Sequence, residues 1–352
     1  MFFSTEPLDI DHVARRHERF RRMECEPEPI LAIQGGQAKL PAGVLPAETR
    51  IIEPDDLRFE LLMDDLQGLR AVFGGWDCAP TVLPAWEVPW VELIMGCRVE
   101  VSDGNFCTRG LGDREAFLER EELEIRERWL EKLVSVYHLL EARRDRRYGI
   151  STTLVRGASD LLAALIGHED MCLLMVDDPE LAYRLLGLCT KTALRIVESQ
   201  LAAIRPLEGH WVNRFGVWAP GPTVVFQEDA AVLLSPGLYR DLVLPWDKEM
   251  AGSVPYPVFH IHSPCVSYVV PELLEVEEVG AIQIRVDPTG PSLEELLPHM
   301  RAVQERKPLI VSGDFSAEHI ASLTENLELG WLEVIAGEQP LRTYLRERGL
   351  VE

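Results

Sequence analysis

The amino-acid sequence predicts an α/β protein folded as a single (β/α)8 TIM barrel with an N-terminal elaboration. From about residue 149 onward, short apolar runs alternate with segments of helical period, and the connections between them are short. The apolar runs are continuous, as in parallel strands that helices cover on both faces. With earlier strands expected near residues 30, 82 and 151, the total is about eight, which favours a barrel over an open doubly wound sheet.

Length and charge limit the other classes of protein. The chain has 352 residues, enough for two ordinary domains or one large barrel. The net charge of -23 argues against nucleic acid and anionic membranes as partners, because phosphate binding relies on basic patches. No Walker or G-x-G-x-x-G sequence follows an expected strand, which argues against a nucleotide-binding sheet.

Cysteine usage and the N-terminus predict a cytoplasmic protein. The 7 cysteines are scattered and form no C-x-x-C pair, which is typical of reduced thiols. The first residues lack the basic and apolar regions of a signal peptide. No apolar run approaches the ~18 residues that a membrane helix needs.

Residues 1–110 are expected to form the N-terminal elaboration and to include the first strands of the barrel. A basic helix is predicted over 9–23, and it ends before the prolines at 27 and 29. A first strand follows at 29–33. The remainder is irregular and rich in proline, with a helix expected at 54–70 and strands at 81–86 and 98–101.

Residues 111–352 are expected to form the main part of the same structural domain. A charged amphipathic pattern predicts a long helix over 112–146. The expected strands are 149–155, 210–217, 256–262, 280–286, 307–312 and 331–336. The expected helices are 157–166, 178–204, 235–252, 266–277, 292–304, 316–328 and 338–348.

Two histidines on one expected strand are the first candidate for a functional site. His260 and His262 are two residues apart, so their side chains point to the same face of a strand. Pro264 ends the strand, and Cys265 lies in the loop that follows. Two imidazoles and a thiol at a strand's end can bind a metal or an acidic substrate. The alternative is a hydrogen-bonded polar layer with a buried cysteine beside it.

Acidic residues near strand ends are further candidates. Glu228 and Asp229 can serve as a metal ligand, a general base or a group that orients the substrate. The alternative is an acidic pair stabilised at a helix N-terminus. Asp314 follows the 307–312 strand at its C-terminal end, where the functional side chains of barrels collect.

Four other side chains are candidates for substrate binding or catalysis. Trp218 can form an aromatic wall, and Arg214 can bind an anion near the end of the 210–217 strand, although structural roles are the alternative for both. Gln283 and Arg285 alternate on the 280–286 strand. Arg285 is the better candidate for binding an anion, because its planar fork matches a carboxylate.

Three segments taken together resemble the uroporphyrinogen decarboxylase superfamily. They are residues 167–181, residues 228–245 with their Leu-Ser-Pro and Leu-Pro core, and Phe259-His-Ile-His262 followed by 281–284 and 312–314. The resemblance implies a single barrel whose site lies at the C-terminal ends of the strands. Members include uroporphyrinogen decarboxylases and zinc-dependent methyltransferases that act on corrinoids or thiols.

The resemblance also suggests ligands for a metal. His260 matches the histidine of the methyltransferases' zinc strand, while His262 stands where they have cysteine. A carboxylate, Glu228 or Asp314, would complete the set, and Cys265 is a further candidate. At 33–39, where decarboxylases carry an arginine-rich loop, this chain has one lysine and no arginine, which argues against uroporphyrinogen as substrate.

The leading functional hypothesis is a metal-dependent methyltransferase that uses zinc, with a corrinoid as methyl carrier. Asp229, Asp314 and Arg285 are the expected catalytic groups. The first alternative is a metal-free decarboxylase or lyase, in which Arg285 and the histidines bind a carboxylated substrate. The second is a corrinoid- or tetrapyrrole-binding protein without catalysis. The expected partners are a small-molecule substrate and a corrinoid protein, and a homodimer is left open.

Overall fold

A sheet of parallel strands organises the computed structural model, which describes residues 9–35, 43–45, 50–62, 70–72, 77–85, 87–102, 105–144 and 148–350. Its 7 strands have the order β1-β15-β14-β13-β12-β11-β8, and each neighbouring pair is parallel. Their bounds are β1 Ile30–Ile33, β8 Val155–Arg156, β11 Thr223–Gln227, β12 Tyr256–His262, β13 Ala281–Val286, β14 Leu309–Gly313 and β15 Leu332–Ala336.

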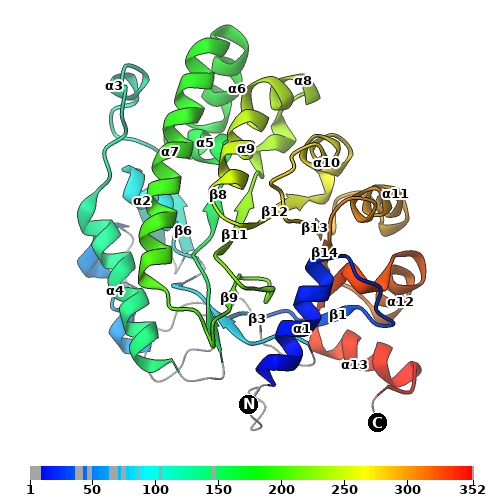
Figure 1. The fold of residues 1–352 in the computed structure, drawn as a ribbon. Helices are drawn as coiled ribbons and strands as arrows, with labels where there is room; N and C mark the ends of the chain where they lie inside the picture. The colour runs from blue at the N-terminus through cyan, green and yellow to red at the C-terminus, as the bar shows by residue number, and fades with distance from the viewer. Residues whose placement is uncertain are drawn as a thin grey trace.

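Helices lie along the outside of this curved sheet (Figure 1). They form as their sequence signals predict: α7 begins at Asp178, whose side chain accepts a hydrogen bond from Leu181 N, and Pro179 is its first residue. The helices are α5 Ala158–Ile166, α6 His168–Asp177, α7 Pro179–Ala203, α9 Leu244–Gly252, α10 Val266–Leu274, α11 Leu293–Gln304, α12 Ala317–Asn326 and α13 Glu338–Glu347. The predicted α/β architecture with a parallel sheet is therefore confirmed.

The strand pairings do not close a barrel within the described residues. β4 (Thr81–Val82) pairs in parallel with β7 (Gly149–Ile150), and β7 precedes β8 on the same stretch of chain. On its other side, β4 pairs with β3 (Arg70–Val72) in antiparallel orientation. In the part of the chain that the structure describes, no pairing joins β4 to β1. The sheet is thus established, and its closure into eight strands is not.

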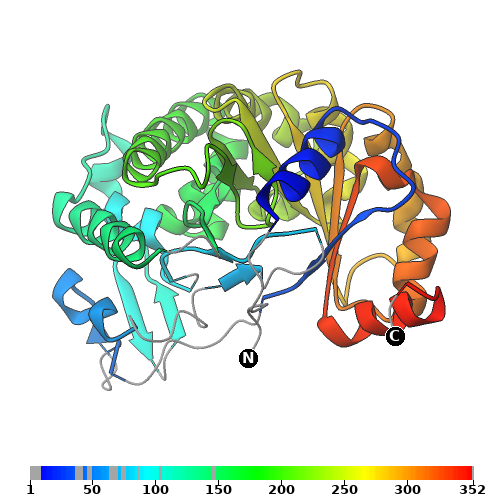
Figure 2. The same cartoon turned by 60° about the horizontal axis from the view of Figure 1, so that its bottom comes forward.

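The N-terminal part contributes a helix at one end of the sheet and a small sheet at its side. α1 (Ile10–Arg21) lies across the strands and contacts β10 (Trp218–Ala219) (Figure 2). β2 (Arg50–Ile51), β5 (Val99–Ser102) and β6 (Asn105–Thr108) form an antiparallel sheet near α2 (Trp90–Met95). One cluster of buried apolar side chains runs from Leu31 to Leu345 and includes residues of α2 and β5, so these two elements share a core with the main sheet.

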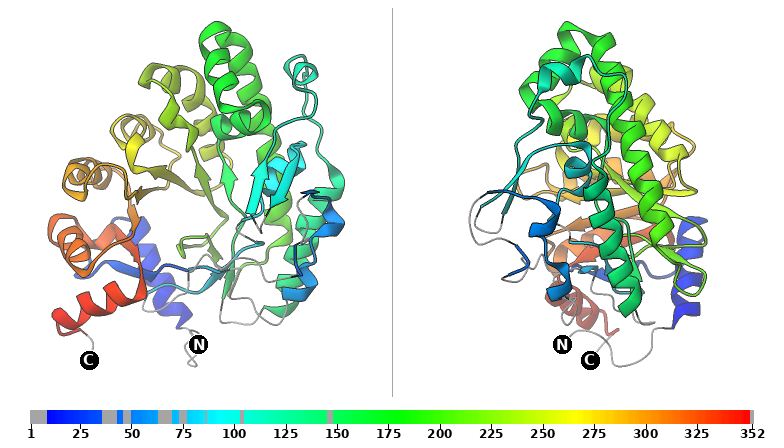
Figure 3. Two further views of the ribbon diagram at one scale, coloured as in Figure 1. Left: turned by 180° about the vertical axis from the view of Figure 1, so that it is seen from behind. Right: turned by 90° about the vertical axis from the view of Figure 1, so that its left-hand side faces the viewer.

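Two predicted helices are wrong in their extent. Residues 54–62 form two 3-10 turns, η1 (Pro54–Asp56) and η2 (Phe59–Leu62), where a helix over 54–70 was expected, and residues 63–69 lie outside the described part. The charged segment 112–146 is divided into α3 (Arg114–Leu118) and α4 (Glu127–Arg143), and α4 packs beside α7 (Figure 3). The apolar stripe is regular only within α4. The charged stretch between α3 and α4 therefore does not continue the helix.

A strand that matters for the site lies later than predicted. Residues 210–217 were expected to form a strand of the main sheet, but β9 (Trp211–Val212) and β10 form an antiparallel hairpin. Its turn depends on Asn213, whose side-chain oxygen accepts from Phe215 N, and on Gly216 at φ +85°. The strand of the main sheet in this region is β11, Thr-Val-Val-Phe-Gln, which lies outside the predicted range.

The inward face of the sheet changes from apolar to polar along the strands. Side chains two apart share a face, so the inward residues of each strand form successive layers. The apolar layer joins Phe20 of α1 to Val225, Val258, Ala281, Ile310 and Ile335. Further toward the C-terminal ends the inward residues are Gln227, His260 and Gln283, which lie side by side in the strand register.

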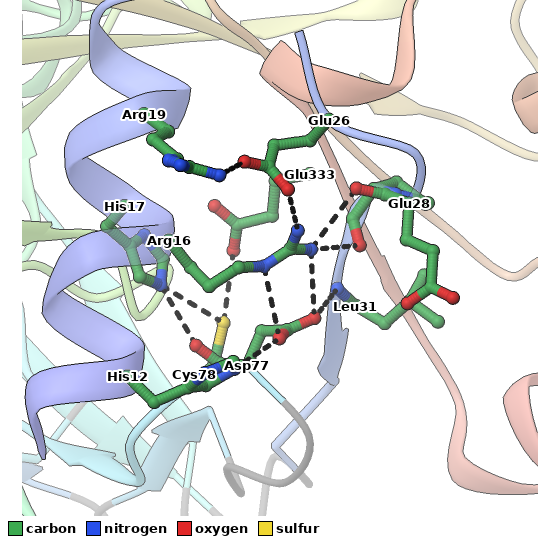
Figure 4. Close-up of polar contacts among 11 residues, drawn as sticks. His12, Arg16, His17, Arg19, Glu26, Glu28, Leu31, Asp77, Cys78 and Glu333 are labelled. Carbon is green, nitrogen blue, oxygen red and sulfur yellow. Dashed lines mark hydrogen bonds and ion pairs between the residues drawn. The ribbon is translucent and has the colours of Figure 1, made fainter. Parts of the chain in front are cut away.

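A buried polar cluster borders the apolar layer, between α1 and β15 (Figure 4). The Cys78 thiol donates to Glu333 Oε1 at 3.7 Å, and His17 Nε2 donates to the Asp77 carbonyl at 3.1 Å. On the outer side Arg16 pairs with Asp77 at 3.4 Å. Glu333 is fully buried, and burial raises the pKa of its carboxyl well above the usual value.

Glu333→Gln is expected to gain stability relative to wild type as pH rises. The Glu333 carboxyl has a pKa near 4.5 in the unfolded chain and a higher pKa in the folded protein. Its contribution to the stability of the fold is therefore complete below pH 4.5 and is lost as pH rises through the folded pKa. The loss approaches about 1.4 kcal/mol per pH unit inside that window. Urea unfolding at about pH 5 and pH 8 measures the gap in the free energy of unfolding between the wild type and the variant. Equal gaps at both pH values would contradict the prediction, and exposed Glu325→Gln is the control.

Candidate functional site

Two histidines and an aspartate meet where β11 and β12 end. Gln227 of β11 lies opposite His260 of β12, so Asp229 and His262, each two residues further on, reach the same face. One ligand atom from each of Asp229, His260 and His262 lies within 4.8 Å of the other two. His262 Nε2 is 3.4 Å from Asp229 Oδ1. The predicted histidine pair therefore has a carboxylate partner.

The outer ring nitrogen of each histidine is fixed by an oxygen acceptor. His262 Nδ1 is 2.9 Å from both carboxylate oxygens of Asp287, and the Ser263 backbone N–H also donates to this carboxylate at 3.1 Å. His260 Nδ1 bonds to Gln283 Oε1, and Gln283 Nε2 donates to Ser312 Oγ at 2.8 Å. Since these oxygens accept, the proton of each ring is on Nδ1, and the lone pair is on Nε2. This pattern orients histidines that bind metals.

The surroundings of His260 keep its imidazole neutral. Burial lowers the pKa of His260 well below its usual value, and the nearby Arg214 charge lowers it further. The β9–β10 hairpin places Arg214 and Phe215 beside it, with the Phe215 ring 5.8 Å from the His260 ring. Burial also lowers the pKa of Arg214 to about 9, which Asp229 opposes. A neutral imidazole is the form that binds a metal.

The Asp229 carboxylate fits a role as the third ligand. Its Oδ2 accepts a hydrogen bond from Gln227 Nε2, while its buried Oδ1 has no hydrogen-bond donor among the described residues. Two ligands about 2.0–2.1 Å from a tetrahedral zinc ion lie about 3.3–3.4 Å apart, close to the 3.4 Å between this oxygen and His262 Nε2. Two nitrogens and one oxygen suit zinc, with a fourth position open for a substrate.

Backbone hydrogen bonds hold Asp229 in place. The carboxylate of Asp160, in α5, accepts from the backbone N–H of Asp229 at 3.0 Å and of Ala230 at 2.6 Å. These are the first residues of the 3-10 turn η4 (Ala230–Leu233) and its cap. The aspartate side chain is thus positioned by an element outside the sheet.

Three of the expected metal ligands lie outside this cluster: Glu228, Cys265 and Asp314, which pairs with Arg285. Glu228 faces outward from the sheet, where it bonds to Ser159 Oγ and contacts Asp247, and burial raises the pKa of its carboxyl. Cys265 is buried beside Tyr268, and burial raises the pKa of its thiol to about 11, so it is protonated near neutral pH. The structure brings none of the three into the cluster, and Asp229, expected to be catalytic, lies there instead.

Of the remaining predicted residues, two lie at the site, and Trp218 lies away from it. Arg285, which lies opposite His262 in the register, forms a rim ion pair of 3.1 Å with Asp314. Gln283 contacts His260 and not open solvent. Trp218 packs against α1, in one apolar cluster with Val13, and so has a structural position.

Sequence reasoning missed Asp287, Gln227 and Asp160. A signal for Asp287 was present, because it follows β13 directly, just as Asp229 lies two residues after the end of β11. Asp160 lies inside an expected helix, and its contact with Asp229 spans 69 positions of the chain. Such a contact is visible only once the elements are packed together.

Comparisons with known proteins support the fold. No family model and no curated protein matches the chain. Among solved structures, a methyltransferase from Methanosarcina mazei matches with a TM-score of 0.60 and 13% identity, over 96% of this chain and 98% of that one. No helix in the described part of the chain is long and apolar enough to cross a membrane. At this identity the likeness extends to the fold alone, and the chain has a methyltransferase-like fold.

Proposed function

We propose that the protein is a metal-dependent methyltransferase whose zinc-type ion is held by Asp229, His260 and His262. The observation that carries the proposal is the convergence of these three groups, with Nδ1 of both histidines held by oxygen acceptors. The likeness in fold to a methyltransferase supports the same class of reaction by analogy of fold alone. Residues at the C-terminal ends of parallel strands are where α/β folds place their chemistry.

The surrounding residues would prepare the site for the acceptor of the methyl group. When bound, zinc lowers the pKa of a thiol or water that it coordinates. Asp287 and Gln283 hold the two imidazoles in the tautomer that leaves Nε2 open. Phe215 stacks on the ring of His260, which is itself buried. Arg285 brings positive charge to the rim beside His262, where it can orient an anionic group.

We also infer that the sheet is part of a (β/α)8 barrel. β4 pairs with β7 in parallel, and β7 leads into β8, so β4 extends the order of the main sheet beyond its last strand. The site would then lie at the mouth of the barrel, with the apolar layer around Phe20 beneath it.

A direct assay tests the function. The purified protein, loaded with zinc, is incubated with methylcobalamin and a series of small thiols, and mass spectrometry measures the methyl thioether formed. Transfer is expected above the protein-free rate. It should disappear after treatment with a chelator and return with added zinc. Bound zinc without transfer to any thiol would contradict the methyltransferase proposal, and transfer that survives metal removal would contradict its dependence on a metal.

A further inference from the structure

A cleft opens beside the candidate site, between the end of β6 and the helices α5 and α6. Its volume is about 630 Å³, within the range of small-molecule sites. Its lining combines the cationic residues Arg109 and Arg156 and the imidazole of His168 with the apolar and small residues of α5 such as Ala164. The cleft therefore has a charged edge and an apolar wall.

Two arginines in this cleft are anchored in the same way. Arg156, at the end of β8, has its Nε 3.1 Å from Glu92 Oε1, and Arg109 has its Nε 3.0 Å from Glu100 Oε2. In the part of the chain that the structure describes, each of these two contacts is made by the Nε nitrogen of the guanidinium. The side chains are 37% and 52% exposed. Each fork is thus oriented by a glutamate while its terminal nitrogens stay available for an oxyanion.

The cleft also contains one acidic residue, Asp160, which weakens its positive charge less than a free aspartate would. Asp160 is buried, and each of its two carboxylate oxygens accepts a hydrogen bond from a backbone N–H group, which partly offsets its negative charge. It also connects the cleft to the candidate metal centre, because the backbone N–H groups that it binds are those of Asp229 and Ala230. A molecule bound in the cleft is therefore separated by one residue, Asp160, from Asp229, which is a proposed metal ligand.

We propose that this cleft binds the oxyanion group, a carboxylate or phosphate, of a substrate whose apolar part lies along α5. Arg109 and Arg156 grip the anion through their terminal nitrogens. The anchored substrate would extend past Asp160 toward Asp229. The assignment to a substrate rests on the proposed methyl transfer, whereas anion binding by the cleft does not.

Calorimetric titration of the full-length protein with inorganic phosphate and with succinate tests this site at low ionic strength. Arg109→Gln and Arg156→Gln are each expected to weaken binding of at least one of these anions about tenfold or more, because each removes charge-assisted hydrogen bonds. Arg128→Gln is the matched control, since Arg128 is an exposed arginine on α4 that pairs with Asp55 outside the cleft. Circular dichroism confirms that each variant is folded, and the exposed Arg109 keeps the test valid if Arg156→Gln is unstable.

Absence of binding by the wild type, unchanged binding by Arg109→Gln, or an equal loss in Arg128→Gln would overturn the proposal. Repeating the titration on chelator-treated protein separates it from the proposed function. Anion binding in a protein that takes up no zinc would support the cleft while refuting the metal centre. Zinc binding without anion binding would refute the cleft alone.

Discussion

A His260→Ala, His262→Ala double variant is expected to lose tight zinc binding, while the wild type holds about one zinc-type ion per chain. The change removes two of three protein ligands and leaves Asp229 as the only one. One carboxylate does not make a zinc site, since catalytic sites use three protein ligands. The expected loss of affinity exceeds the 10–100-fold typical of changes around a ligand, because here the ligands themselves are removed.

Metal content by mass spectrometry, after purification without chelator and dialysis against zinc, measures this effect. A His12→Ala, His138→Ala double variant is the matched control, because it removes two exposed imidazoles from outside the site. It should keep the wild-type metal content. Equal zinc in both double variants, or none in the wild type, would refute the proposed metal centre.

The position of the candidate site could be predicted from the sequence, and its proposed third ligand could not. The spacing of His260 and His262 places both on one face of a strand, and continuous apolar runs indicate a parallel sheet whose C-terminal ends gather such residues. The choice between Glu228 and Asp229 depends on the register of β11. A shift of one residue exchanges the faces of a strand, and β11 was not recognised, so the choice could not be made.

Other parts of the site depend on contacts between distant segments. Arg214 reaches the neighbourhood of His260 because residues 211–219 form a hairpin and not a strand of the main sheet. The turn residues Asn213 and Gly216 are a local signal for that hairpin. The packing of its tip beside His260 has no such signal in the sequence, because it depends on how the hairpin sits against the sheet.

Gly157→Ala is expected to destabilise the fold by about 2–4 kcal/mol, although the backbone at this position suits alanine. A Cβ atom there would lie 1.9 Å from Glu228 Oε1 and 2.2 Å from Glu228 Cδ. Glu228 is fully buried and bonded to Ser159, so it cannot move aside without losing that contact. Urea unfolding of the two proteins measures the difference. Gly252→Ala, in α9 with no atom within 4 Å of the added carbon, is the control and should change stability by less than about 1 kcal/mol.

A double-mutant cycle identifies the cause of this loss. The three atoms nearest to the added carbon are Oε1, Cδ and Cγ of Glu228, and Glu228→Ala removes all three. Gly157→Ala should therefore cost little in the Glu228→Ala background, and the two changes should show a large coupling energy. Additive effects would mean that the glycine is needed for another reason. Strong coupling would show that Gly157 makes room for a buried carboxyl next to Asp229, and hence that the close packing of β8 against β11 helps to place the candidate ligand.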